Sequence, residues 1–100
     1  MRIITTSRIV EFYTKHADAK LPLEVWVSRI KALKINNLNE LKQVANSVDV
    51  IGNNRVIFDI KGNKYRLIVS IDYEGQLIYI KYILTHAEYD KDNWKNDPYF

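Results

Sequence analysis

An imidazole, a phenol and two carboxylates lie close together at the end of an almost entirely apolar run. The run spans residues 77–84 and leads directly into Thr85-His86-Ala87-Glu88-Tyr89-Asp90. Imidazole has an unperturbed pKa of about 6.5, so His86 is the best acid–base group of the chain at neutral pH. If this segment turns helically, Tyr89 and Asp90 share a side with His86, and Asp90 can orient the ring. A histidine at a strand end, satisfied by a backbone carbonyl, is the alternative without chemistry.

A second cluster of reactive types consists of cations that precede this segment in the chain. They alternate with apolar residues and are Arg55, Lys61, Lys64, Arg66 and Lys81, which we expect on one exposed face of a sheet. A two-residue Gly62-Asn63 turn would pair Lys61 with Lys64 and Asp59 with Arg66. Two lysines facing each other are mildly destabilising, and a phosphate in front of them would relieve that cost. Ordinary solvated surface charge is the alternative interpretation.

The elements that must position these residues follow from the hydrophobic periods. Residues 2–5 favour a short strand, and Thr6 or Ser7 can cap a helix that carries Ile9, Val10, Phe12, Tyr13 and Ala17. Pro22 suits the first turn of a second helix, whose apolar face consists of Leu23, Trp26, Val27, Ile30 and Leu33. A short helical piece from Glu40 would bury Leu41, Val44 and Val48.

From residue 55 the period changes to two, which predicts three antiparallel strands connected by turns at Gly62-Asn63 and Glu74-Gly75. A two-residue loop at the second turn places Lys81 on the polar face beside Arg66 and Ser70. The pattern predicts an α+β two-layer domain with one covered and one exposed sheet face. We expect residues 1–100 to form a single domain, with a loosely ordered tail from about residue 91. Trp94, Tyr99 and Phe100 in that tail either dock on the protein or a partner, or belong to a frayed end.

Composition excludes several classes of protein. The formal net charge of +3 is mildly basic, which on its own only hints at a polyanionic partner. The absence of cysteine excludes disulfides and thiolate metal sites. The sequence has no apolar run long enough for a membrane span and no secretion signal, which favours a cytoplasmic location. A zinc site built on His16 and His86 has no supporting ligand spacing, and we expect no metal or other cofactor.

The residues that carry the chemistry resemble those of a known family. Gly62-Asn63-Lys64-Tyr65-Arg66-Leu67 followed by Thr85-His86-Ala87-Glu88-Tyr89-Asp90 is similar to the paired hallmark of HigB toxins from bacterial type II toxin–antitoxin systems. The resemblance implies a RelE-like fold, in which two N-terminal helices pack on one face of a small, mostly antiparallel sheet and mRNA lies on the other. Two residues depart from the pattern: Asp59 stands where Asn is more frequent, and Lys81 where Arg is common.

The resemblance also implies a ribosome-dependent endoribonuclease that cleaves translated mRNA by metal-independent attack of a ribose 2′-OH. We assign catalysis to Lys64, Arg66, His86 and Tyr89, and RNA contacts to Arg55, Lys61, Asn63 and Lys81. Arg66 would hold the phosphate oxygens, Tyr89 the nucleotide, and His86 or Lys64 would transfer protons. A lysine base needs a lowered pKa, and the charges of Lys61 and Arg66 would act in that direction.

The partners implied are a HigA-like helix-turn-helix antitoxin, the ribosome and mRNA. DNA would be contacted only through the antitoxin, and no membrane is involved. A protein that binds RNA or protein through the same basic face without cleaving, as a degenerate toxin, is the alternative function.

Overall fold

The computed structural model describes residues 1–45, 48–52, 54–91 and 93–96. Its strands are β1 (Arg2–Ile4), β2 (Asp49–Val50), β3 (Arg55–Ile60), β4 (Tyr65–Asp72) and β5 (Leu77–Thr85). Its helices are α1 (Ser7–Lys15), α2 (Lys20–Ala32), α3 (Leu38–Val44) and α4 (His86–Asp90), with 3₁₀ turns η1 (Ala17–Ala19) and η2 (Asn93–Asn96). The sequence-based elements are all present, and β2 is an additional strand that the periods did not indicate.

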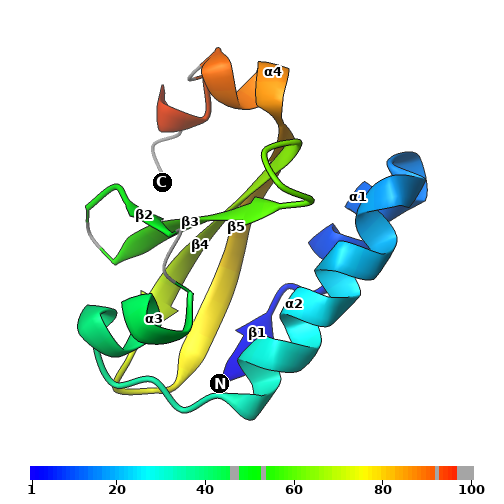
Figure 1. Cartoon of the computed structure of the whole chain (residues 1–100). Helices are drawn as coiled ribbons and strands as arrows, with labels where there is room; N and C mark the ends of the chain where they lie inside the picture. The colour runs from blue at the N-terminus through cyan, green and yellow to red at the C-terminus, as the bar shows by residue number, and fades with distance from the viewer. Residues whose placement is uncertain (46–47, 53, 92, 97–100) are drawn as a thin grey trace.

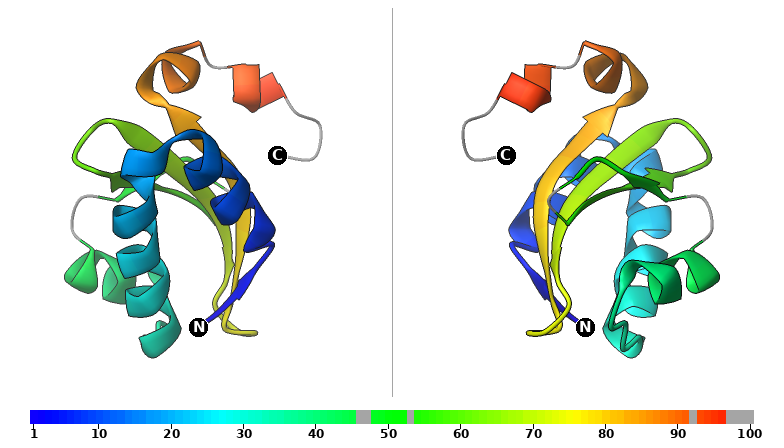
Figure 2. Two further views of the ribbon diagram at one scale, coloured as in Figure 1. Left: turned by 90° about the vertical axis from the view of Figure 1, so that its right-hand side faces the viewer. Right: turned by 90° about the vertical axis from the view of Figure 1, so that its left-hand side faces the viewer.

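The five strands form one mixed sheet in the order β1-β5-β4-β3-β2. β1 pairs with β5 in parallel, and the other neighbours are antiparallel. α1 and α2 cover one face of this curved sheet, and the chain after β5 passes over its end toward the opposite side (Figures 1 and 2). The α+β architecture is therefore confirmed, and it is compatible with a RelE-like domain.

The main core lies between the sheet and the helices because the alternating strands present their apolar sides to the apolar faces of α1 and α2. Leu23, Trp26 and Ile30 of α2 are buried, as the helical period predicts. Trp26 packs edge-on against Phe58 of β3, with ring centroids 5.4 Å apart. Pro22 lies in the first turn of α2, where a missing backbone N–H costs nothing.

Three expectations about the helices are wrong in detail. Val44 of α3 is 39% exposed and is not part of the core, although it was expected to be buried. α3 begins at Leu38 because the side chain of Asn37 caps it by accepting a hydrogen bond from the backbone N–H of Glu40. Val48 is buried but lies beyond the end of α3. No helix in the described part of the chain combines the length and apolar content that crossing a bilayer requires.

The opposite face of the sheet carries a small core of its own, which was not predicted. Ile57 of β3 and Ile68 of β4 are buried against Trp94 of η2, and the partly buried Tyr82, Leu84 and Tyr89 pack around them. The expectation of one bare, exposed face is therefore wrong over this part of the sheet. Trp94 docks on the protein itself and is 5% exposed, whereas Tyr99 and Phe100 lie outside the described residues.

Candidate functional site

α4 starts where β5 ends, and two residues of the Thr85–Asp90 segment fix that junction. Thr85 Oγ1 accepts a hydrogen bond from the backbone N–H of Glu88, and Glu88 Oε1 accepts one from the backbone N–H of Thr85. This capping box satisfies two backbone donors that the first turn of a helix leaves free. Thr85 and Glu88 therefore have a structural role, which is to aim the side chains of α4.

His86 and Asp90 lie one turn apart on α4, and they are paired. The distance from His86 Nε2 to Asp90 Oδ2 is 3.2 Å, in agreement with the expectation that Asp90 orients the ring. The backbone N–H of His86 donates to the backbone oxygen of Lys64, at 3.1 Å, which fixes the start of α4 beside the β3–β4 turn. The side chains of His86 and Asp90 are both more than half exposed, so they are accessible to a ligand.

Lys64 and His86 line one open groove of about 650 Å³. Its walls come from elements far apart in the sequence: the end of α1 with η1 on one side and the start of α4 on the other, with β4 between. The lining residues are Lys15, His16, Ala17, Asp18, Lys64, Tyr65, Thr85, His86 and Ala87. Two of the predicted catalytic residues are thus brought together, along with residues of α1 and η1 that the motifs did not include.

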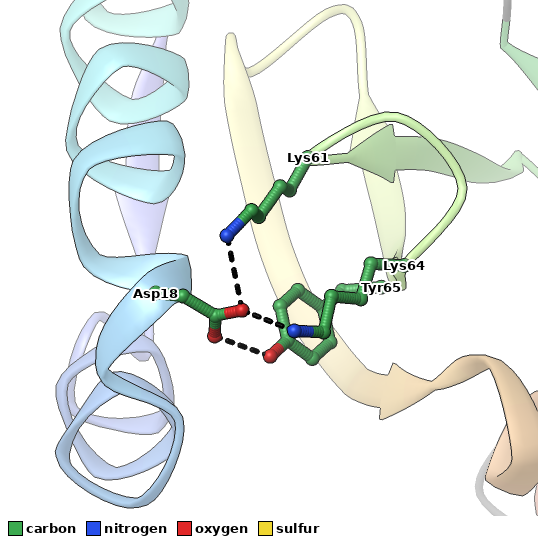
Figure 3. Close-up of polar contacts among 4 residues, drawn as sticks. All are labelled: Asp18, Lys61, Lys64 and Tyr65. Carbon is green, nitrogen blue, oxygen red and sulfur yellow. Dashed lines mark hydrogen bonds and ion pairs between the residues drawn. The ribbon is translucent and has the colours of Figure 1, made fainter.

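Asp18 of η1 holds the β3–β4 turn through three side chains (Figure 3). Its Oδ2 accepts hydrogen bonds from Lys64 Nζ and, at 3.1 Å, from Lys61 Nζ, and its Oδ1 accepts one from the Tyr65 hydroxyl at 2.5 Å. The hydrogen bonds from Lys64, Tyr65 and Lys61, in that order, hold the pKa of Asp18 well below its usual range. Hydrogen bonding to Asp18 also raises the pKa of Lys64 and of Tyr65.

This arrangement corrects two predictions about the lysines. Asp59 pairs with Arg66 as expected, but the last ladder pair is Ile60 with Tyr65, so Lys61 and Lys64 lie in the connecting loop and not opposite each other in the ladder. Positive φ angles occur at Lys61 (53°) and Gly62 (63°). The anion that relieves the repulsion between the lysines is Asp18 of the same chain. The expectation that neighbouring cations lower the pKa of Lys64 is wrong, because this carboxylate raises it.

Arg66 and Tyr89 form a second group at the same end of β4 and β5. Arg66 Nη1 lies 2.9 Å from Asp59 Oδ1, and its side chain is only 12% exposed. Its guanidinium carbon lies 5.3 Å from the centre of the Tyr89 ring, which stacks on Trp94 at 5.5 Å between centroids. The Tyr89 ring is therefore already engaged by Arg66 and Trp94, and a nucleotide base that stacked there would displace one of them.

The four predicted RNA contacts occupy different places. Arg55 Nη1 donates to Ser70 Oγ at 2.9 Å across the β3–β4 ladder, and the backbone oxygen of Asn63 accepts from Arg66 Nη1 at 3.2 Å. Lys61 is bound to Asp18.

The predicted position of Lys81, the fourth of these residues, is wrong. The β4–β5 register shifts between Ile68 and Val69, which pair with Tyr82 and Ile80, so Lys81 is left out of the ladder in a bulge. It lines a second groove with Arg8, Phe12 and other residues of α1, and the expectation that it shares a polar face with Arg66 and Ser70 is wrong.

Asp18, Tyr65 and His16 are the site residues that sequence reasoning missed. The alternating pattern assigned Tyr65 to the core, and its ring is buried there, but its hydroxyl reaches the groove. Asp18 lies more than 40 residues from its partners, so no local spacing signals the contact. Within the described residues, no group of three or more His, Cys, Asp or Glu side chains is arranged to hold a metal ion.

Comparison with known proteins identifies the family. The family described as HigB_toxin, RelE-like toxic component of a toxin–antitoxin system, matches residues 19–92. The mRNA interferase HigB of Escherichia coli O6:H1 is 28% identical over 93 residues, covering 91% of this chain and 90% of that protein. The mRNA interferase toxin HigB of Escherichia coli K12 is 27% identical over 92 residues, covering 90% and 88%. Since the family match spans most of the sequence, this protein belongs to the HigB toxins, the RelE-like toxic components of toxin–antitoxin systems.

Proposed function

We propose that this protein is the toxin of a type II toxin–antitoxin system and acts as an endoribonuclease that cleaves translated mRNA on the ribosome. The observation that supports the activity best is the placement of His86 beside Lys64 on one open groove, in a chain of this family. The relatives named above are called mRNA interferases, which is the same class of reaction. His86 supplies acid–base chemistry and Lys64 a fixed positive charge.

The proposed reaction needs no metal ion. The ribose 2′-oxygen attacks the adjacent phosphorus, the bond from phosphorus to the 5′-oxygen breaks, and the products are a 2′,3′-cyclic phosphate and a 5′-hydroxyl. A base removes the proton of the 2′-OH, an acid gives one to the departing 5′-oxygen, and cations stabilise the phosphorane between these steps. His86 is a proton carrier in this scheme, with Asp90 holding its ring at 3.2 Å.

Lys64 and Arg66 serve as cations in this reaction. Because hydrogen bonding to Asp18 raises the pKa of Lys64, its ammonium group stays protonated at neutral pH and is unsuited to remove a proton. Arg66 has the forked donor geometry that suits non-bridging phosphate oxygens. Tyr89 packs under the guanidinium of Arg66 and holds it in position or contacts the nucleotide. Arg55, Lys61, Asn63 and Lys81 would contact the RNA backbone.

The remaining partners follow from this function. The ribosome would hold the mRNA in a reactive orientation, so the free protein would cleave RNA slowly. A HigA-like helix-turn-helix antitoxin would silence the toxin and contact DNA on its behalf. A ribosome-bound activity places the protein in the bacterial cytoplasm, acting as a single domain over residues 1–100.

The first test is to replace His86 and Arg66 separately with alanine and to induce each variant in cells without antitoxin. Both variants should fail to arrest growth and should produce none of the new mRNA 5′ ends that the parent creates. General acid–base catalysis contributes about 10²–10⁴-fold, so loss of His86 should leave only residual cleavage.

Purified variants must still bind the antitoxin, which shows that they are folded. Growth arrest at the parental level by both variants would refute the site. A parent that arrests growth without producing any new 5′ ends would favour the non-catalytic binding protein.

A further inference from the structure

The proposed reaction moves two protons, and the proposal so far assigns only one proton carrier, His86, among the predicted residues. Lys64 is held as an ammonium by Asp18, so it does not serve as the second carrier at neutral pH. The chain contains two histidines, His16 and His86. Imidazole is the side chain whose two protonation states are both accessible near neutral pH, so the position of His16 is decisive.

His16 is held rigidly at the end of α1. Its backbone N–H donates to the oxygen of Phe12 at 2.9 Å, and its own backbone oxygen accepts from the N–H of Ala19 at 2.9 Å. Its ring stacks on Phe12, with centroids 4.5 Å apart, and lies 5.6 Å from the Tyr65 ring. The imidazole is thus fixed by aromatic contacts and only half-buried.

The stacking contacts of His16 do not explain why this position carries an imidazole, because its ring nitrogens take no part in them. Within residues 1–45, 48–52, 54–91 and 93–96, no side chain or backbone group forms a hydrogen bond or an ion pair with the His16 imidazole. A phenylalanine would make the same stacking contacts. The nitrogens remain available to a ligand, in contrast to those of His86, one of which is paired with Asp90.

His16 and His86 line the same groove from different walls. His16 comes from the end of α1 and His86 from the first turn of α4, with Lys64 and Tyr65 between them. A ribose-phosphate unit in this groove would have an imidazole from each wall and a cation from the β3–β4 turn. In an in-line displacement the attacking and departing oxygens lie on opposite sides of the phosphorus, so the two proton transfers call for two separate groups, and imidazoles from two different elements can provide them.

We propose that His16 is a catalytic residue and that it forms, with His86, the acid–base pair of the ribonuclease. One imidazole takes the proton of the 2′-OH as the new bond from the 2′-oxygen to phosphorus forms. The other gives a proton to the 5′-oxygen as its bond to phosphorus breaks. Lys64 balances the charge of the phosphorane. This inference rests on the proposed function and adds to it His16, which follows the end of α1 and lies outside the 19–92 segment of the family match.

The test is His16→Phe, which keeps a ring on Phe12 and removes both nitrogens. Cleavage of mRNA on purified bacterial ribosomes should slow by about 100-fold or more, the contribution typical of one proton carrier. The melting temperature and antitoxin binding should stay close to those of the parent. His16→Gln places a polar side chain without a ring at this half-exposed position, and its cleavage rate should fall by the same factor. Val25→Ala, on the exposed side of α2, is the control and should cleave normally.

A pH profile separates a catalytic role from a packing role. The parent should show a bell-shaped dependence of rate on pH, because one imidazole must be neutral and the other protonated. His16→Phe should lose one limb of the bell, whereas a packing defect would lower the whole curve. Besides His86, the charged groups that share the two grooves with His16, and are present in both proteins, are Arg8, Glu11, Lys15, Asp18, Lys64, Lys81 and Glu88.

Cleavage of a modified mRNA shows which of the two histidines is the general acid and which is the general base. With sulfur in place of the 5′-oxygen at the cleavage site, the leaving group departs without a proton, so loss of the acid no longer matters. Either His16→Phe or His86→Ala should regain the parental rate on this substrate, and the other variant should stay slow. Rescue of both variants or of neither would overturn the pair.

The outcomes also separate this inference from the function it rests on. If the parent cleaves, His86→Ala does not, and His16→Phe cleaves at the parental rate, the inference is wrong and the ribonuclease stands. If the parent itself produces no cleavage on ribosomes, the proposed function fails.

Discussion

Three of the predicted catalytic side chains each have a carboxylate of the same chain beside them. Asp18 binds Lys64, Asp59 binds Arg66, and Asp90 binds His86. The groups that would hold RNA are thus partly neutralised and oriented before RNA arrives. The formal net charge of the molecule is only +3, so its overall attraction for RNA is modest. A phosphate that binds at the site must also compete with these carboxylates for the same cations.

Asp59 is the carboxylate whose removal should help the reaction. Its Oδ1 lies 2.9 Å from Arg66 Nη1 and offsets part of the charge that the phosphorane needs. Asp59→Asn keeps a hydrogen-bond acceptor there and removes the negative charge. We expect cleavage on ribosomes to become about fivefold faster, about 1 kcal/mol, the upper end for a partly exposed ion pair.

The measurement is the single-turnover rate of parent and variant at equal ribosome concentration. Asp49→Asn on the exposed strand β2 removes the same charge away from the site and should leave the rate unchanged. A slower Asp59→Asn variant would mean that the carboxylate matters mainly for holding Arg66 in place.

At the scale of the elements, periodicity predicted the strands and helices but not the contacts between them. A period of two in β3 and β4 follows from the alternation of side chains between the two faces of the sheet, and it correctly paired Asp59 with Arg66. The same period runs through residue 81 without interruption, so the bulge that takes Lys81 out of the ladder has no sequence signal. The loop at Lys61 was mispredicted because Gly62-Asn63 is typical of a tight turn, whereas the chain uses a longer loop that Asp18 holds.

The link from η1 to the β3–β4 loop is the contact that completes the groove, and it should make stability depend on pH. The pKa of Asp18 is lowered in the folded protein, chiefly by the hydrogen bond from Lys64. Its ion pairs therefore stabilise the fold above the unfolded pKa of about 4, and this stabilisation is lost as pH falls toward the folded value. Asp18→Asn should melt at a lower temperature than the parent at pH 7.

That difference in melting temperature should shrink steadily as the pH is lowered below about 4. Thermal unfolding followed by circular dichroism over a pH series measures it, and Asp49→Asn should show no comparable gap. A gap that stays constant down to low pH would show that the carboxylate charge is not what links η1 to the loop.

At the scale of the whole molecule, the two tryptophans report on two separate cores. Trp26 lies between α2 and the sheet, and Trp94 lies on the opposite face against Ile57 and Ile68. The second core contacts the residues beside Arg66, because Trp94 Nε1 donates to the backbone oxygen of Tyr89 at 3.1 Å and its ring stacks on the Tyr89 ring. Trp94 of η2 therefore helps to hold Tyr89 against Arg66. The polar composition of the tail did not suggest this role.

Replacing each tryptophan with alanine should separate stability from activity. Both are more than nine-tenths buried, so each change should lower the free energy of unfolding by about 3 kcal/mol, as buried tryptophans usually do. Where both variants are still folded, Trp26→Ala should cleave mRNA at close to the parental rate. Trp94→Ala should cleave more slowly, because Tyr89 loses its stacking partner and Arg66 loses the ring that holds it.

Urea titration gives the two free energies, and cleavage on ribosomes at low temperature gives the two rates. Trp94→Phe keeps a stacked ring and should recover most of the rate while losing the hydrogen bond to Tyr89. Equal rates for Trp94→Ala and Trp26→Ala would mean that the second core stabilises the sheet without positioning the site. A rate that falls for Trp94→Ala alone would tie η2 to catalysis through the stacking of Trp94 on Tyr89 and the contact of Tyr89 with Arg66.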